Sequence, residues 1–220
     1  MTRTGARARH SDQHARRRLL IATGSRHKFE ELSTLLDLPN TELVSLADLG
    51  LTDDSPEEAA TFAENAAFKA RWYAQLSGLP TLADDSGLEV DALDGRPGVR
   101  TRRFAGENAT DEQNNVHLLR LLDGVPPDQR GARYRCVLAL AEVGADRAPE
   151  IELASGEFVG RIASGPRGSG GFGYDPIFEP AGEPTGGRTV GLLTSDEKNA
   201  ISHRAAAARV MRAVLVARGY

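Results

Sequence analysis

Residues 81–90 read TLADDSGLEV, and this stretch is the best guide to the fold. Its apolar start predicts a buried β-strand that delivers two consecutive carboxylates, Asp84 and Asp85, into a Ser86-Gly87 turn. Side chains alternate between the two faces of a strand, so only one of these acids can enter a given cleft. With no lysine or arginine nearby in the sequence, such an acid suits an oxygen-liganded divalent metal. The alternative is a turn in which one Asp accepts bonds from backbone amides and the other is solvated.

Helix and strand patterns are interleaved around this stretch, which predicts an α/β domain with a mixed sheet. Extended segments are expected at residues 18–23, 41–46, 81–85, 88–93, 132–143 and 150–162. Helices are expected at residues 27–37, 61–77 and 111–122, with one long terminal helix over 195–219.

Composition indicates one domain over residues 19–220, preceded by a disordered basic tail over residues 1–18. The formal charge of −4 is uneven, because the tail carries six arginines and one aspartate and the remainder has a charge of −9. An acidic body of this kind is a poor nucleic-acid binder. No export signal and no run long enough to span a membrane are present. Cys136 is the only cysteine, which excludes an internal disulfide, and these features together predict a cytoplasmic protein.

The 61–77 helix carries a polar, a cationic and an aromatic side chain on one face. Asn65, Lys69 and Trp72 follow one another at spacings of four and three residues. This stripe could face a ligand, and the alternative is an ordinary solvated surface.

Two acidic patterns precede that helix. Ser55, Pro56, Glu57 and Glu58 have the form of a capping box with proline at the first helical position, and Thr61 fits a second cap. The two glutamates can cap a helix, bind a metal ion, or do both.

The segment GSGGFG at 168–173 satisfies the dinucleotide-binding pattern, but Tyr174, Asp175 and Pro176 follow it instead of a helix. A Rossmann interpretation therefore fails, although the glycines allow the backbone to approach a ligand closely. Phe172 could offer a ring face and Asp175 an acceptor. The alternative is a flexible surface loop.

Three donor-rich side chains, Lys198, His203 and Arg204, lie close together near the start of the last predicted helix. Cations are disfavoured at that end of a helix, so an anionic or carbonyl ligand is expected to compensate them. Pairing with the neighbouring Asp196 and Glu197 is the alternative.

The chain resembles the inosine triphosphate pyrophosphatase family, the Ham1-like nucleoside triphosphate pyrophosphatases, from Leu19 to the C-terminus. Five separated segments occur in the order and spacing of that family: ATGSRHK (22–28), TFAENAAFKA (61–70), LADDSGLEVDAL (82–93), GGFGYDPIF (170–178) and EKNAISHR (197–204). The resemblance implies an elongated mixed sheet flanked by helices, with two lobes and a central cleft. It also implies hydrolysis of dITP, ITP and XTP to the monophosphate and pyrophosphate, which removes deaminated purines from the nucleotide pool. A Mg²⁺ ion in each subunit and a homodimer are further implications, with no nucleic-acid or membrane partner.

The same resemblance assigns roles to particular residues. Asp85 corresponds to a metal-binding acid and proposed general base, Lys69 to a lysine that faces the phosphates, and Ser86 to a substrate contact. Glu58 and Glu57 are the candidates for a further metal ligand. The triphosphate loop corresponds to Thr23, Gly24, Ser25, Arg26, His27 and Lys28, and the base pocket to Phe172, Gly173, Tyr174, Asp175, Lys198, His203 and Arg204.

The sequence departs from the family pattern in three places. Ser25 stands where asparagine is usual, the segment between Glu58 and Thr61 is a residue short, and the basic tail has no counterpart. Three other functions remain open: a Maf-like pyrophosphatase acting on pyrimidine or modified nucleotides, a nucleotide sensor without catalysis, and nucleic-acid binding through the tail.

Overall fold

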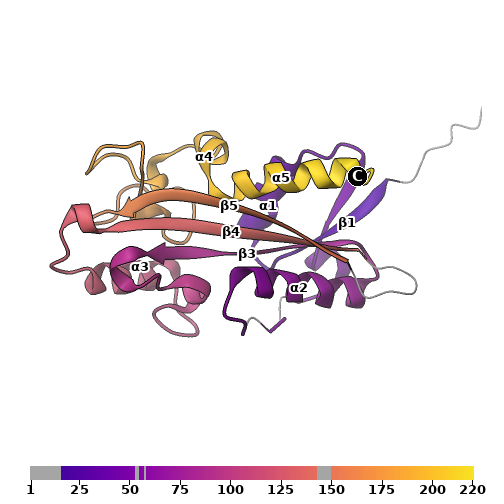
Figure 1. Cartoon of the computed structure of the whole chain (residues 1–220), viewed down its shortest axis with the longest axis horizontal. Coiled ribbons are helices and arrows are strands. Elements are labelled where there is room, and N and C mark those ends of the chain that lie inside the picture. Colours follow the sequence, from indigo (N-terminus) through magenta and orange to yellow (C-terminus); the bar gives the residue numbers. More distant parts are fainter. Residues whose placement is uncertain (1–15, 53–54, 57, 143–149) are drawn as a thin grey trace, which may run out of the picture.

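The computed structural model describes residues 16–52, 55–56, 58–142 and 150–220. These residues form a six-stranded mixed sheet of order β2-β1-β3-β4-β5-β6, flanked by helices (Figure 1). The strands are β1 (Arg17–Ala22), β2 (Thr41–Ser45), β3 (Thr81–Val90), β4 (Gly131–Glu142), β5 (Glu150–Ile162) and β6 (Phe178–Pro180). The α-helices are α1 (Arg26–Leu36), α2 (Phe62–Ser77), α3 (Asp111–Leu121), α4 (Ser195–Ile201) and α5 (His203–Ala217). The predicted α/β class with an elongated mixed sheet is confirmed.

Strand β1 is short and β3 continues past its end. β1 pairs in parallel with β2 and with residues 81–83 of β3, whereas β3, β4, β5 and β6 pair antiparallel. From Asp84 onward, β3 therefore has β4 on one side but no β1 residue on the other. The loop that follows β1 lies beside this open edge, which is where the carboxyl ends of parallel strands commonly place ligands.

The two faces of the long strands are covered by different helices. Leu82 and Leu138 pack with α1 and α5 on one face, whereas Ala83 and Ala139 pack with α2 on the other. Figure 1 shows α5 and α2 on opposite sides of β3, β4 and β5. This separation follows from the alternation of side chains along each strand.

A third apolar cluster builds the second lobe, at the other end of the long strands. It includes Leu88 of β3, Leu118 of α3 and Phe178 of β6. Figure 1 shows α3 and α4 at this end of the molecule, remote from β1. The two ends of one continuous sheet thus belong to two lobes.

Residues 81–90 form one continuous strand, so the predicted Ser86-Gly87 turn is wrong. Ser86 and Gly87 pair with Cys136 and Arg135 of β4 within the ladder. Gly87 is required for packing, because a Cβ there would lie 2.6 Å from the Gly98 carbonyl oxygen and 2.9 Å from a ring carbon of Phe62. A glycine inside a strand often marks such a close approach.

The predicted terminal helix is interrupted at Ser202. This residue has extended backbone angles, φ −70° and ψ 159°, and it ends α4 and caps α5. Its hydroxyl accepts the amide N–H of Ala205 at 3.1 Å. The apolar spacing continues across residue 202, and for this reason the sequence predicted one helix where the structure has two.

The segment before α2 also differs from expectation. Ser55, Pro56 and Glu58 are not helical, so the first predicted capping box does not open a helix. The second does, since Thr61 is the N-cap of α2 and its hydroxyl accepts the amide N–H of Glu64 at 3.2 Å. Within the described ranges, no helix combines the length and apolar character that crossing a membrane requires.

Candidate active site

A cavity of about 900 Å³ lies at the open edge of β3, between the two lobes. Its lining includes residues from the loop after β1, from α1, α2, β3 and β4, from the segment before β6, and from α4 and α5. All the residues predicted for the triphosphate loop and the base pocket line this cavity, as do Lys69, Asp85 and Ser86. The central cleft expected for the fold is therefore present, and the predicted residues share it.

The loop after β1 turns directly into α1 at the cavity wall. Thr23 accepts the amide N–H of Ser25 through its hydroxyl at 3.2 Å, and Ser25 caps α1 by accepting the amide N–H of Lys28. The amino end of α1 thus borders the cavity, where unpaired amides and the helix dipole favour an anion. Ser25, the departure from the family pattern, has a structural role as this cap.

Asp84 and Asp85 point to opposite faces of β3, as the alternation predicted. Asp85 lines the cavity, whereas Asp84 faces α1 and α5 and is 1% exposed. Asp84 accepts from the Lys28 ammonium, from Arg204 Nε at 3.0 Å, from the Ser86 hydroxyl at 2.9 Å and from the Cys136 thiol at 3.2 Å. Burial disfavours its charge, but Arg204 and Lys28 outweigh burial and hold the pKa of Asp84 well below its usual value.

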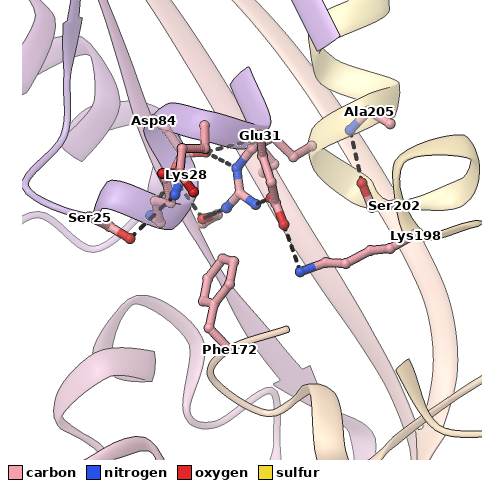
Figure 2. A network of polar contacts seen from close by, with 12 residues as sticks. Ser25, Lys28, Glu31, Asp84, Phe172, Lys198, Ser202 and Ala205 are labelled. Carbon is pink, nitrogen blue, oxygen red and sulfur yellow. Dashed lines mark hydrogen bonds and ion pairs between the residues drawn. The ribbon is translucent and has the colours of Figure 1, made fainter. Parts of the chain in front are cut away.

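Glu31 of α1 joins the same network from the other side. Its carboxylate pairs with Lys198 Nζ at 2.7 Å and with the Arg204 guanidinium (Figure 2). Lys198 also pairs with Asp175 at 2.8 Å. Carboxylates from α1, β3 and the loop before β6 therefore compensate the cations at the start of α4 and α5. The sequence also allowed these cations to pair with Asp196 or Glu197. The structure shows a different arrangement, in which Glu197 pairs with Arg188.

Phe172 and Asp175 line the cavity from the segment before β6. The Phe172 ring lies under Lys198 Nζ at 4.3 Å and stacks on His27 with centroids 5.5 Å apart. Asp175 is 3% exposed and accepts from Lys198, from the Phe172 amide at 2.9 Å and from the Tyr134 hydroxyl at 3.2 Å. Burial raises the pKa of Asp175 although Lys198 opposes this effect. The end of the glycine-rich segment is thus held in place by these contacts and forms part of the cavity wall.

His203 is buried at the first position of α5. A Cβ at residue 156 would lie 2.2 Å from the His203 carbonyl oxygen, so Gly156 of β5 allows the helix start to sit against the sheet. Burial, with Arg204 beside it, lowers the pKa of His203 well below its usual value of 6.5. The imidazole is therefore neutral at pH 7. Among the described residues, no group hydrogen-bonds to its Nδ1.

The predicted stripe on α2 divides between interior and surface. Lys69 is 4% exposed and lines the cavity, whereas Asn65 is buried and accepts the Ala59 amide N–H at 3.0 Å. Trp72 is 41% exposed and stacks on Phe68. The solvated-surface alternative therefore applies to Trp72 alone.

The acidic residues of the cavity suit a metal ion that is held mostly by its substrate. Glu57 lies outside the described residues, and Glu58 is exposed and does not line the cavity. Across the described part of the chain, no cluster of three or more His, Cys, Asp or Glu side chains could hold a metal. Asp85 presents a buried carboxylate to the cavity that Lys69 also lines, and Mg²⁺ commonly binds through one or two carboxylates together with substrate phosphates.

Several residues of the site were not predicted from sequence, among them Glu31, Tyr134 and Arg102. Glu31 and Tyr134 bind the predicted residues directly, and Arg102 lines the cavity from the 3₁₀ helix Gly98–Arg103. Glu31 lies one helical turn after Lys28, so its position on the same face of α1 was a usable signal. Nothing in the strand pattern of β4 distinguishes Tyr134 from a core aromatic residue.

Residues 19–214 match the Ham1 family. The chain belongs to the Ham1 family. The predicted resemblance is thereby confirmed, and the Maf-like alternative loses its basis.

Curated relatives share nearly half of their residues with this member of the Ham1 family. A protein of Shigella flexneri named dITP/XTP pyrophosphatase is 45% identical over 194 residues, which cover 88% of this chain and 95% of the relative. A protein of the same name from Geobacter sulfurreducens is 46% identical over 196 residues, with coverages of 89% and 94%.

Solved structures of the family agree with the fold. A HAM1 protein from Coxiella burnetii superposes with a TM-score of 0.78 at 41% identity, covering 91% of this chain and 98% of that one. A nucleoside-triphosphatase, or dITP/XTP pyrophosphatase, from Mycobacterium abscessus gives a TM-score of 0.70 at 41% identity, with coverages of 90% and 98%.

Proposed function

We propose that this protein hydrolyses non-standard purine nucleoside triphosphates, dITP, ITP and XTP, to the nucleoside monophosphate and pyrophosphate. The observation that carries the proposal is that one cavity is lined by Lys69 and Asp85 and also by Phe172, Lys198 and His203. Such a cavity fits a polyanion joined to a planar base. The names of the relatives, at about 45% identity over most of the chain, support the same substrate class.

At the phosphate side, water attacks the α-phosphorus and the bond to the bridging oxygen of the β-phosphate breaks. Asp85 holds the attacking water and takes up its proton. Negative charge grows on the leaving pyrophosphate, and the ammonium groups of Lys69 and Lys28 stabilise it. Lys28 can do so while paired with Asp84, because an ammonium has three donors. No covalent enzyme intermediate is needed.

We propose Mg²⁺ as the metal, one ion in each subunit, held by Asp85 and the substrate phosphates. When bound, it supplies Lewis-acid stabilisation of phosphate charge and lowers the pKa of coordinated water. Of the two predicted glutamates, Glu57 lies outside the described residues and remains a candidate for a further ligand, whereas Glu58 does not line the cavity. The assignment of Mg²⁺ is supported by the presence of Asp85, Lys28 and Lys69 in the lining of one cavity.

Base selectivity is proposed to come from the residues predicted for the base pocket. Lys198 uses two of its three donors on Glu31 and Asp175, which leaves one for a base oxygen such as the 6-oxo group. Neutral His203 lines the same cavity and is proposed as a further contact of the base. Adenine presents an amino group where hypoxanthine and xanthine present oxygen, so the Lys198 donor would be left unpaired. Such mismatches discriminate by roughly 10⁴-fold in sites built on hydrogen bonds.

A homodimer in the cytoplasm completes the proposal. The dimer and its location rest on the family resemblance. The acidic charge of residues 19–220 separately disfavours nucleic acid as a partner.

A panel of nucleoside triphosphates assayed for pyrophosphate, with and without Mg²⁺, tests the proposed activity. We expect turnover of dITP, ITP and XTP with Mg²⁺ and little turnover of dATP, ATP or CTP. Binding of dITP without pyrophosphate release would identify a sensor instead and overturn the proposal.

Asp85→Asn tests the role of the acid. We expect a loss of kcat of at least about 10²-fold with the fold intact, since a positioned general base contributes this much or more. Glu89→Gln is the matched control, because Glu89 follows on the same face of β3 but pairs with Arg133 and Arg135 outside the cavity. Wild-type rates for Asp85→Asn would contradict the assignment.

A further inference from the structure

Tyr134 of β4 touches two polar residues of the proposed base pocket, His203 and Asp175. Its ring stacks on the His203 ring with centroids 4.8 Å apart and an interplanar angle of 8°. Its hydroxyl donates to Asp175 at 3.2 Å, and burial raises its pKa, so it remains a donor at neutral pH. Tyr134 also lines the cavity.

The ring of His203 needs an external support. Its backbone is fixed by α5 and by the close approach of Gly156, but the outer torsion of a histidine side chain has only a weak preference. In the described structure, hydrogen bonding does not hold Nδ1. The parallel face of Tyr134, which stacks on the imidazole, is placed to fix the plane of the ring.

Tyr134 is itself anchored on two sides. Asp175 holds its hydroxyl, and Phe178 packs against its ring with centroids 4.7 Å apart. Lys198 holds the other oxygen of Asp175 at 2.8 Å. The orientation of His203 is thus tied to the residues that present Lys198.

We infer that Tyr134 is a positioning residue, which holds the His203 ring in the plane needed to read the base edge and so contributes to selectivity between 6-oxo and 6-amino purines. The inference deepens the proposed function and depends on it for the substrate. Stacking, and not the hydroxyl, is the feature that matters most.

Three variants separate stacking, hydrogen bonding and packing. Tyr134→Leu removes the ring, and Tyr134→Phe keeps the ring but removes the hydroxyl. Phe158→Leu is the packing control, because Phe158 pairs with Tyr134 across β4 and β5 and also packs on Phe178, at 5.2 Å, but does not line the cavity.

We expect Tyr134→Leu to lower the dITP/dATP ratio of kcat/KM by at least about tenfold, mainly because kcat/KM for dITP falls. Tyr134→Phe should keep the ratio within about threefold, and Phe158→Leu should leave it unchanged even if it lowers the Tm. An unchanged ratio in Tyr134→Leu, or an equal fall in Phe158→Leu, would overturn the inference.

Histidine ¹⁵N NMR of the same proteins gives a readout that needs no turnover. The ring signals of His203, identified by their absence in His203→Gln, should form one sharp set in the wild type, Tyr134→Phe and Phe158→Leu, as expected for a single ring orientation. In Tyr134→Leu these signals should broaden or split, because the ring then samples more than one orientation. Unchanged sharp ring signals in Tyr134→Leu would refute the positioning role, whereas a failed nucleotide panel with the expected NMR pattern would refute only the substrate.

Discussion

At the scale of single residues, Asp84 is the carboxylate on which the site is assembled. Its partners come from distant parts of the chain. They are Lys28, 56 residues away, Cys136, 52 residues away, and Arg204, 120 residues away. Within the part of the chain that the structure describes, Lys28, Lys198 and Arg204 are matched by Asp84, Glu31 and Asp175. Removing one member leaves buried charge uncompensated, which costs more than the intact pair contributes.

Asp84→Asn is therefore expected to destabilise the fold by about 3–5 kcal/mol in urea unfolding at pH 7. The pKa of Asp84 is lowered, so its stabilising contribution is complete above the unfolded pKa of about 3.9 and is lost as pH falls through the folded value. The gap between wild type and variant should stay constant from pH 5 to 8 and close only in strong acid. Glu42→Gln, which breaks an exposed pair with Arg18, should cost at most about 1 kcal/mol. Equal small losses would show that the network does not stabilise the fold.

At the scale of elements, the break between α4 and α5 decides where the base-pocket residues point. Lys198 lies in α4, and His203 and Arg204 start α5. In one continuous helix, residues 198 and 203 would lie on different faces, as their spacing predicts. The extended backbone of Ser202 changes the direction of the chain and lets all three line one cavity.

Ser202→Ala and Thr194→Ala form a matched pair, because each removes the N-cap of one of these helices. Both variants should lose about 1 kcal/mol of stability in denaturant unfolding. Only Ser202→Ala should also lower the dITP/dATP ratio of kcat/KM, since α5 begins with His203. A change of the ratio in Thr194→Ala alone would contradict this role for the break.

At the scale of the whole molecule, the basic tail and the sheet meet at β1. The sheet begins at Arg17, two residues before the predicted domain boundary, and Arg17 lies over the ring of Tyr220 at 4.3 Å. The family match begins at residue 19, and residues 1–15 lie outside the described structure. The tail and the catalytic body can therefore be separated only on the amino-terminal side of Arg17.

Deletion of residues 1–15 should leave dITP hydrolysis and Tm at wild-type values. Deletion of residues 1–18 should lower the Tm, because it removes the pairs of Arg17 and Arg18 with Thr41 and Glu42 and the contact with Tyr220. Retention on immobilised DNA at low and high salt tests the remaining alternative for the tail. Salt-sensitive retention lost in the shorter deletion would establish nucleic-acid binding by residues 1–15.

Sequence by itself determined the α/β class, the positions of most elements, the opposite orientations of Asp84 and Asp85, and the family. These features depend on local periodicity, capping and contiguous segments, which are written along the chain. Only the tertiary structure decided that Ser86-Gly87 continues a strand, that Ser202 divides a helix, and that Glu31, Asp84 and Asp175 compensate the cations of α4 and α5. Each of these depends on contacts between residues far apart in the sequence, where close packing and charge compensation override local preference.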